Sequence, residues 1–184
     1  RSTIIPHGIA QEFFCSPRTQ QPIEAYSKQQ PFKLLYVSTV DLYKHQWHVV
    51  EAVGRLRRTG VPVALELAGA AYPPALRRLR QALQHVDPSG EYIQYKGAVR
   101  YSDLPALYRS ADAFVFASSC ENLPNILLDA IASGCIEQAM LRLLGNVSLR
   151  TASAARAYQK ACAYSWSQCA ASTFEFLGKV APGE

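Results

Sequence analysis

Two acidic side chains in the middle of the chain occupy positions that suit the binding of a polar ligand, one in a polar turn and the other on the helix that follows it. Glu121 and Asp129 are separated by seven residues. Pro124 suits the first turn of a helix, where its missing N–H costs nothing, and Gly134 suits the position just past the helix end. Because a helix N-terminus presents free N–H groups and a favourable dipole, Glu121 can simply cap the helix. It can equally stand at the rim of a phosphate-bearing ligand and accept hydrogen bonds from hydroxyl groups.

The segment before this turn predicts where the acids lie in the fold. Residues 113–117 form a short run rich in Phe and Val, which is typical of a buried strand. Residues 118–123 predict a polar loop at the C-terminal end of that strand, the edge at which open α/β sheets bind their ligands. On the helix that follows, Asn125, Asp129 and Ser133 recur every four residues. They form one polar stripe, which faces either water or a ligand.

The stretch from Ser118 to Gly134 resembles the E-x(7)-E signature of retaining GT-B glycosyltransferases of family 4, the glycosyl transferases group 1 type. Asp129 stands in place of the second Glu and keeps the charge on a shorter side chain. The resemblance implies a C-terminal domain that binds a nucleotide sugar linked to UDP, GDP or ADP. It implies that Glu121, the predicted catalytic residue, holds sugar hydroxyls near C3 and C4, and that Asp129 holds the ribose. It further implies that Asn122 and Leu123, through their backbone N–H groups, and Asn125 are substrate-binding residues.

A second group of candidate residues follows the first strong strand. The loop of residues 38–41 lies at the same edge of the predicted sheet, and Lys44, one turn into the next helix, can reach a diphosphate there as a compact charge. An ordinary exposed helix lysine fits the sequence as well. The loop resembles the family's Arg…Lys-Gly donor motif, with Lys44 matching the Lys, Thr39 in place of Arg and His45 in place of Gly. We therefore predict Ser38, Thr39 and Lys44 as substrate-binding residues.

Two further patterns concern the nucleobase and metals. Val99 follows Lys96-Gly97-Ala98 at a strand end. The resemblance implies that the backbone of this loop meets the nucleobase, whereas an ordinary βα turn fits the sequence equally well. His45 and His48 are three residues apart without an evident third ligand, so we predict no metal site. The resemblance likewise implies a metal-independent reaction without a cofactor, in which the helix dipole and cations stabilise the departing diphosphate.

The rest of the chain must place these groups. Strands recur every 25–30 residues or roughly so, with helices between them, which is the βαβ rhythm of a parallel sheet. We predict an α/β fold: a Rossmann-like doubly wound parallel sheet with helices on both faces and a helical C-terminal end. Asp41 is the predicted N-cap of the first long helix. The predicted strands are 33–37, 63–67, 92–95 and 113–117, and the predicted helices are 42–59, 73–85, 103–110, 124–133, 136–144, 148–163 and one from Ser165 onward.

The length of 184 residues suits a single donor-binding domain, 1–184, forming the C-terminal half of a GT-B enzyme. The segment Ile5-Pro6-His7-Gly8-Ile9 resembles the start of that domain in the family, and residues 10–31 predict a surface loop. Cys135 is followed at once by a helix, where the family has roughly one more βαβ unit of about 30 residues. Either the protein lacks this unit, or the sequence joins two segments across it. Because both flanks resemble the family in the right order, we predict the second: a missing segment between residues 135 and 136.

The amino-acid composition indicates which kinds of binding partner and which cell compartment to expect. Hydrophobic residues make up 49% and charged residues 18%, which is typical of a globular chain. The net charge of +5 weakly favours anionic partners, either nucleotide phosphates or acidic lipid headgroups at a membrane surface. We interpret the arginines of 55–58 and 77–80 as solvated helix faces and predict no nucleic-acid partner. Five cysteines without Cys-x-x-Cys spacing, no signal peptide and no long apolar run predict reduced, mostly buried thiols and a cytoplasmic protein.

Three missing motifs argue against other classes of protein. The sequence has no Gly-x-Gly-x-x-Gly, as expected of a nicotinamide- or flavin-binding Rossmann domain, and no Gly-Lys-Ser/Thr loop, as expected of a P-loop NTPase. It also has no Gly-x-Ser-x-Gly elbow, as expected of an α/β-hydrolase. Two hypotheses remain. The first is a retaining glycosyltransferase of polysaccharide biosynthesis, whose N-terminal domain holds a glycan or lipid-linked acceptor; the chain of 184 residues alone would then bind nucleotide without turnover. The alternative is a catalytically degenerate GT-B-like binding or assembly module, which the replacements at Asp129, Thr39 and His45 motivate.

Overall fold

The computed structural model describes residues 2–5, 8–14, 16, 19–118, 135–162 and 164–180. The chain divides into two compact units. The larger unit is Gln20–Val147, and the smaller unit combines Arg1–Thr19 with Ser148–Glu184. All of the predicted site residues belong to the larger unit.

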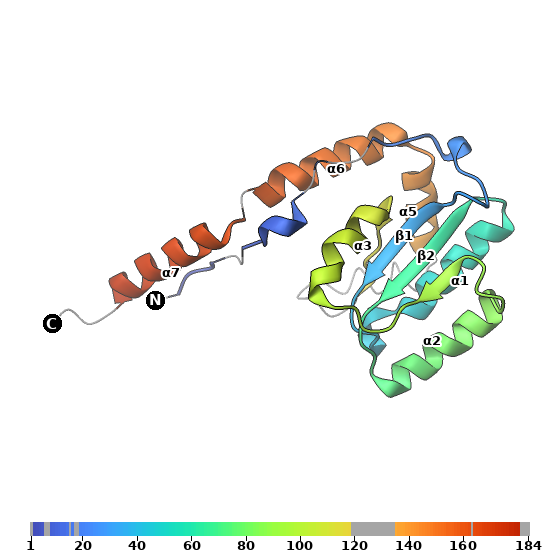
Figure 1. Ribbon diagram of the computed structural model, residues 1–184, viewed down its shortest axis with the longest axis horizontal. Helices are drawn as coiled ribbons and strands as arrows, with labels where there is room; N and C mark the ends of the chain where they lie inside the picture. The colour runs from blue at the N-terminus through green and yellow to red at the C-terminus, as the bar shows by residue number, and fades with distance from the viewer. Residues whose placement is uncertain are drawn as a thin grey trace. The chain divides into compact units, whose positions relative to one another are not determined.

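The larger unit is built on a parallel sheet of four strands, as the sequence predicts (Figure 1). The strand order is β3-β2-β1-β4, which was not predicted from the sequence. β1 pairs with β2 in a register that sets Phe32 beside Val63 and Leu34 beside Leu65. The fourth strand is shorter than predicted. After Val115 donates to the carbonyl of Leu35, the chain leaves the ladder. The strands are β1 (Phe32–Val37), β2 (Val63–Ala68), β3 (Ile93–Tyr95) and β4 (Ala113–Phe114).

Helices cover both faces of this sheet, so the predicted layered architecture is confirmed. Helices α1 (Gln46–Arg58), α2 (Pro73–Val86) and α5 (Cys135–Leu144) pack around one hydrophobic core with the buried strand residues. On the opposite side, α3 (Leu104–Ser110) places the Tyr108 ring 5.7 Å from that of Phe114 (Figure 1). α1 carries an apolar stripe at helical spacing that is fully buried: Val49, Val50, Val53 and Leu56.

The start of α1 differs from the prediction of a helix from 42 to 59. Asp41 does accept a hydrogen bond from the backbone of Leu42 at 2.7 Å, but it caps a short 3-10 helix, η3 (Leu42–Lys44). His45 then adopts a left-handed conformation with φ of 53°. Because a left-handed L-residue cannot continue a right-handed helix, α1 begins only at Gln46.

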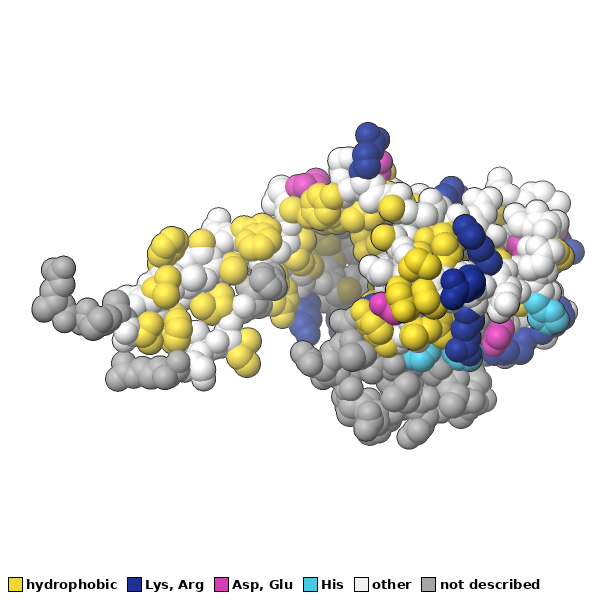
Figure 2. Space-filling view, turned by 90° about the horizontal axis from the view of Figure 1, so that it is seen from below, with side chains coloured by type: hydrophobic (Ala, Val, Ile, Leu, Met, Phe, Trp, Pro, Cys, Tyr) yellow, Lys and Arg dark blue, Asp and Glu magenta, His cyan; other side chains and the backbone are white. Residues whose placement is uncertain are grey.

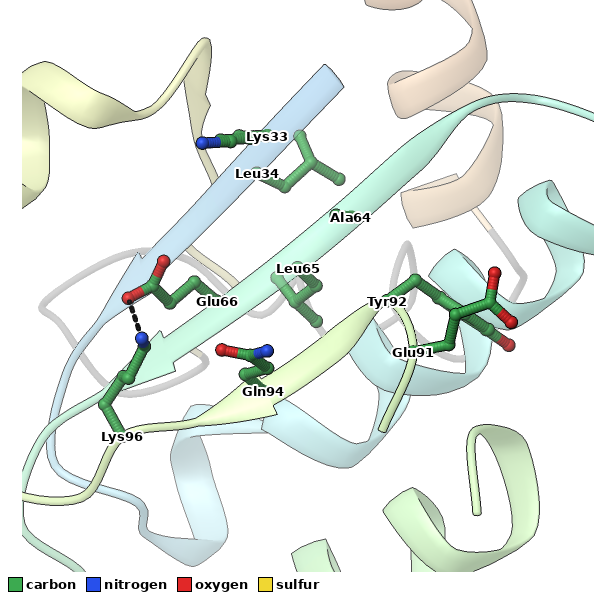
Figure 3. A pocket seen from close by; sticks show the side chains of 9 residues that line it. All are labelled: Lys33, Leu34, Ala64, Leu65, Glu66, Glu91, Tyr92, Gln94 and Lys96. Carbon is green, nitrogen blue, oxygen red and sulfur yellow. Dashed lines mark ion pairs between the residues drawn. The ribbon is translucent and has the colours of Figure 1, made fainter. Parts of the chain in front are cut away.

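The sheet face on the α3 side is polar over β2 and β3. Glu66 and Lys96 form an ion pair at 3.4 Å, and Lys33 and Gln94 project from the same face into a pocket of about 310 Å³ (Figure 3). Side chains on this face alternate with buried ones along the strands, as expected when one face of a strand meets water. The hydrophobic core therefore lies on the side of α1.

One prediction about side-chain exposure needs correction. Arg57 is not solvated: its side chain is only 8% exposed, pairs with Glu91 at 3.1 Å and lies over the Tyr92 ring. Of the five cysteines, predicted to be mostly buried, the structure describes the burial of two: Cys162 is exposed and Cys169 is half-buried, both with free thiols. For the other three the burial stays a prediction.

The smaller unit joins the N-terminal segment to two helices, α6 (Val147–Cys162) and α7 (Trp166–Val180). The backbone N–H of Ile9 donates to Tyr164 at 3.1 Å, and the hydroxyl of Ser165 accepts from Gln168 and so caps α7. None of the helices in the described ranges has both the length and the apolarity that a membrane crossing requires. Between 10 and 31 the chain forms two 3-10 helices, Gln11–Phe13 and Ile23–Ala25. The predicted break between 135 and 136 falls within α5 and stays a prediction.

Candidate functional site

The loops that follow β1, β2 and β3 meet at one edge of the sheet, which we call the C-terminal edge. The backbone of Ser38 donates to Ala68 at 2.9 Å, and that of Gly69 donates to Gly97 at 2.8 Å. These bonds continue the ladder past the ends of the strands. The structure therefore brings the predicted Ser38 loop beside the loop that leads to Val99.

Gly69 allows a close backbone approach at this edge. Its φ is 144°, and a Cβ atom there would lie 2.0 Å from the carbonyl oxygen of Ser38. Only glycine tolerates both this conformation and this contact. The carbonyl of Gly69 accepts from the hydroxyl of Tyr95 at 2.8 Å, so the loop after β2 is held from both sides.

Lys44 ends η3 and is almost fully buried, 9% exposed, which excludes the interpretation as an ordinary exposed helix lysine. Its ammonium nitrogen lies 5.0 Å from the ring centre of Tyr43 and 5.2 Å from that of Phe116, so two aromatic faces surround the charge. Phe116 follows β4. Lys44 thus lies where the loop after β1 meets the chain leaving β4, which is the place predicted for a diphosphate-binding cation.

A second buried side chain holds this loop, and sequence reasoning missed it. Gln46 is only 1% exposed, and its Nε2 donates to the carbonyl of Thr39 at 2.9 Å. The same carbonyl accepts from the hydroxyl of Ser38 at 2.9 Å, while Thr39 itself is exposed. A signal was available, because Gln46 shares the helical phase of Val49, Val50 and Val53 and so had to face the core.

Tyr36 is the other residue that the sequence reasoning passed over. It is 1% exposed, and its hydroxyl donates to the carbonyl of Lys44 at 2.7 Å and accepts from the backbone N–H of Ala117 at 3.2 Å. Ala117 and Ser118 are themselves buried. A Tyr within an apolar strand is typical of core packing, so nothing in the sequence distinguished its hydroxyl.

His45 and His48 belong to an aromatic cluster rather than to a recognisable metal centre. Their rings lie 5.8 Å apart, Trp47 is 5.9 Å from each, and the Arg78 guanidinium lies 4.2 Å from the Trp47 ring centre. Burial, together with the neighbouring His48 and Arg78 charges, lowers the pKa of His45. Within the described part of the chain, no three His, Cys, Asp or Glu residues are grouped to hold a metal ion.

Val99 is half-buried and lines a pocket of about 470 Å³ beyond the end of β3. The pocket is bounded on one side by Arg100 and Asp103, which pair at 3.0 Å. That pairing and its hydrogen bonds lower the pKa of Asp103. The pocket offers apolar and charged surface together, a combination that suits a heteroaromatic ring.

The basic residues of α2 flank the C-terminal edge. Figure 2 views the molecule from below, with α2 toward the viewer, and shows hydrophobic side chains beside a row of basic ones. The sequence of α2 holds no acidic residue, and its arginines Arg77, Arg78 and Arg80 are exposed. This side of the larger unit therefore carries a positive field that favours anionic ligands.

The remaining predicted site residues lie outside the described residues: Glu121, Asn122, Leu123, Asn125 and Asp129. Their roles stay predictions. The described part of the site therefore consists of the Ser38–Lys44 loop, Val99 and the end of β4.

Comparison with known sequences gives one family. The family described as "Glycosyl transferases group 1" matches residues 31–136, which is more than half of the chain. The matched range spans β1 to the start of α5 and includes all of the predicted site residues. No curated protein matches the chain.

Solved structures share the fold at low sequence identity. A glycosyltransferase from Rickettsia africae ESF-5 is 16% identical with a TM-score of 0.67, over 99% of this chain and 58% of that one. The C-terminal domain of a glycosyl transferase group 1 family protein, LpcC from Francisella tularensis, is 20% identical with a TM-score of 0.61, over 81% and 93%. The pneumococcal O-GlcNAc transferase GtfA, solved with UDP and GlcNAc, is 17% identical with a TM-score of 0.56, over 90% and 38%. The chain thus spans less than two thirds of two of these proteins and nearly all of the isolated C-terminal domain.

Proposed function

The chain belongs to the glycosyl transferases group 1 family, and from this premise we propose that it is the donor-binding half of a retaining glycosyltransferase. The donor is a nucleotide-diphosphate sugar. The acceptor, a glycan or a lipid-linked sugar, is held by an N-terminal domain, as in a two-domain GT-B enzyme. Residues 1–184 alone then bind nucleotide without turnover. The proposed setting is polysaccharide biosynthesis in the cytoplasm, with peripheral contact to an anionic membrane.

The placement of Lys44 is the single observation that carries this proposal. A buried ammonium at the C-terminal edge of a parallel sheet stands where such folds bind ligands, and it can neutralise charge on a diphosphate. As the sugar leaves the diphosphate, negative charge grows on the β-phosphate oxygen. A preorganised cation and a helix N-terminus stabilise that charge without a metal ion.

The other roles rest on the sequence resemblance. Glu121 holds sugar hydroxyls, Asp129 holds the ribose, and the backbone N–H groups of Asn122 and Leu123 face the donor. Asn125, Ser38 and Thr39 are the further residues that bind the donor. The pocket beside Val99 supports a nucleobase position next to that loop. Thr39 supplies a hydroxyl where the family has a guanidinium, so Lys44 carries more of the diphosphate charge in this chain.

Calorimetric titration with UDP, GDP and ADP, and with their sugars, tests the proposal. UDP is the first choice because GtfA was solved with UDP, although at 17% identity that likeness concerns the fold alone. We expect one of the three diphosphates to bind to the chain, with a metal chelator making no difference. If none binds, either to this chain or to the full-length protein, the proposed function is wrong.

A degenerate binding module is the second candidate, and the replacement of one cation and one acid favours it: Thr39 stands for Arg and Asp129 for Glu. Such a module keeps the sheet and its core but has lost donor affinity. Thr39→Arg distinguishes the two readings. A degenerate site gains diphosphate affinity from the added charge, by about 1.5–3 kcal/mol, whereas a functional site that has adapted to Thr39 gains little or loses affinity.

A further inference from the structure

We propose that Tyr36 is a positioning residue of the donor site, which acts through the backbone of Lys44. The proposal rests on the proposed function, because it gives Lys44 a diphosphate to bind. It goes beyond that function in assigning a role to a strand residue that touches no ligand.

The hydroxyl of Tyr36 joins two segments that are far apart in the chain. It donates to the carbonyl of Lys44 at 2.7 Å, in the loop after β1, and accepts from the N–H of Ala117 at 3.2 Å, in the chain leaving β4. Both bonds are buried. A tyrosine hydroxyl is one of the few side-chain groups that can donate and accept at once. A phenylalanine would fill the same volume but make neither bond.

The aromatic ring of Tyr36 packs against Phe116, the residue whose ring also contacts the Lys44 ammonium. The Tyr36 and Phe116 rings lie 6.0 Å apart, edge to face, and the Lys44 ammonium lies over Phe116 at 5.2 Å. The backbone and the side chain of Lys44 are therefore fixed by one connected set of contacts. Without the Tyr36 hydroxyl, the Lys44 backbone can shift relative to Phe116. A displacement of the ammonium group by about 1 Å is enough to weaken its contact with an anion.

The nearby contacts of the loop do not replace this one. Gln46 holds the carbonyl of Thr39, the Asp41 side chain holds the N–H of Leu42, and the Asp41 carbonyl accepts from the Lys44 N–H at 3.1 Å. Each of these bonds fixes an atom other than the Lys44 carbonyl. Tyr36 is the side chain that ties the Lys44 carbonyl to the exit of β4. Losing its hydroxyl leaves a buried acceptor and a buried donor without this partner, one on each side of the site.

A double-mutant cycle tests the assignment. UDP, GDP and ADP are first titrated into the unmodified chain, and the diphosphate that binds most tightly is used for Tyr36→Phe, Lys44→Met and the double variant. We expect Tyr36→Phe to weaken binding about five-fold and Lys44→Met about ten- to hundredfold. In the Lys44→Met background, Tyr36→Phe should change the affinity by less than about two-fold, because a residue that acts through Lys44 has nothing left to position.

Thermal unfolding separates positioning from mere stability. Tyr36→Phe should lower the Tm by the same amount with and without Lys44→Met. Tyr92→Phe is the matched control: its hydroxyl donates to the Val86 carbonyl at 2.9 Å before β3, away from the C-terminal edge, so stability should fall with affinity unchanged. Replacing Tyr36 with 4-aminophenylalanine, which keeps a donor on the ring, should recover part of the affinity; it also provides a folded test protein if Tyr36→Phe does not fold.

Three results would overturn the assignment. Unchanged affinity in Tyr36→Phe with a lowered Tm makes the hydroxyl purely structural. An equal loss of affinity in the Lys44→Met background means that Tyr36 acts by another route. Failure of both the unmodified chain and the full-length protein to bind any of the three diphosphates removes the proposed function and this assignment with it, and is distinguished from the other two because it precedes any substitution.

Discussion

The ammonium nitrogen of Lys44 lies 5.2 Å from the centre of the Phe116 ring, although the two residues are on different loops. The Tyr43 ring flanks the same charge at 5.0 Å. An ammonium group held between aromatic faces is partly desolvated, and there its attraction for an anion is stronger than in water. This arrangement presets the charge for a ligand at the edge of the sheet.

Lys44→Met should weaken the binding of a nucleoside diphosphate by about 1.5–3 kcal/mol, because Met keeps the volume of the side chain and removes its charge. The affinity for the corresponding nucleoside, which has no phosphate, should stay the same. Lys33→Met is the control, since Lys33 lies on the polar sheet face and is exposed. Titration calorimetry at low and high salt measures both. Equal loss for nucleoside and diphosphate would mean that Lys44 does not contact the phosphates.

The position of Lys44 illustrates what the sequence could and could not predict. Strand periodicity and the loop motif correctly located Lys44 at the C-terminal edge, because the carboxyl ends of parallel strands share one edge. The sequence did not predict its burial or its aromatic neighbours. Phe116 comes from a segment far along the chain, and contacts between distant segments leave no local pattern.

His45 adopts a left-handed conformation, and this predicts an unusual order of stability among its variants. His45→Gly should be more stable than His45→Ala by about 1 kcal/mol, since both remove the ring and only Ala keeps the Cβ atom that the left-handed region disfavours. In ordinary helix positions the order is reversed. Urea unfolding of the two variants gives the difference. Ala equal to or above Gly would contradict the left-handed assignment.

The lowered pKa of His45 predicts a loss of stability in mild acid. Burial, His48 and Arg78 all disfavour the charged imidazole in the folded state, so the unfolded chain takes up the proton first, near its ordinary pKa of 6.5. The free energy of unfolding is therefore at its full value above about pH 6.5, and it decreases as the pH falls from there toward the folded-state pKa of His45. His45→Asn should flatten this part of the stability curve, measured by urea unfolding between pH 8 and pH 5, or thereabouts. The same slope in the variant would assign the effect to another group.

Gly69→Ala should be strongly destabilising, because its Cβ would lie 2.0 Å from the Ser38 carbonyl. Gly60→Ala is a matched control: Gly60 also has a positive φ, of 88°, but nothing lies within 4 Å of the added atom. We expect a loss of about 1 kcal/mol for Gly60→Ala, from conformation alone, and about 2 kcal/mol more for Gly69→Ala, from overpacking. Similar losses in both variants would show that the loop after β2 moves away from Ser38 at little cost.

The fold was more predictable than the contacts within the site. The spacing of four apolar residues predicts a buried helix face, and the structure buries all of them: Val49, Val50, Val53 and Leu56. The hydroxyl of Tyr36 and the amide of Gln46 are different: each is a single polar group within an apolar pattern, and its partner is a backbone atom of a loop. Residue type and period cannot identify such a partner, because it exists only after the loop has closed.

The two acids of the E-x(7)-E-like segment, Glu121 and Asp129, should affect different parts of the donor when they are replaced. If Glu121 holds the sugar, Glu121→Ala weakens nucleotide-sugar binding by about 1.5–3 kcal/mol through lost charged hydrogen bonds, and leaves the nucleoside diphosphate unaffected. If it only caps a helix, the change costs about 1 kcal/mol of stability instead. Asp129→Ala should weaken the nucleoside diphosphate itself, because the ribose is common to both ligands. Calorimetry with the diphosphate and its sugar on both variants decides, and equal weakening of both ligands in both variants would show that the two carboxylates do not divide these roles.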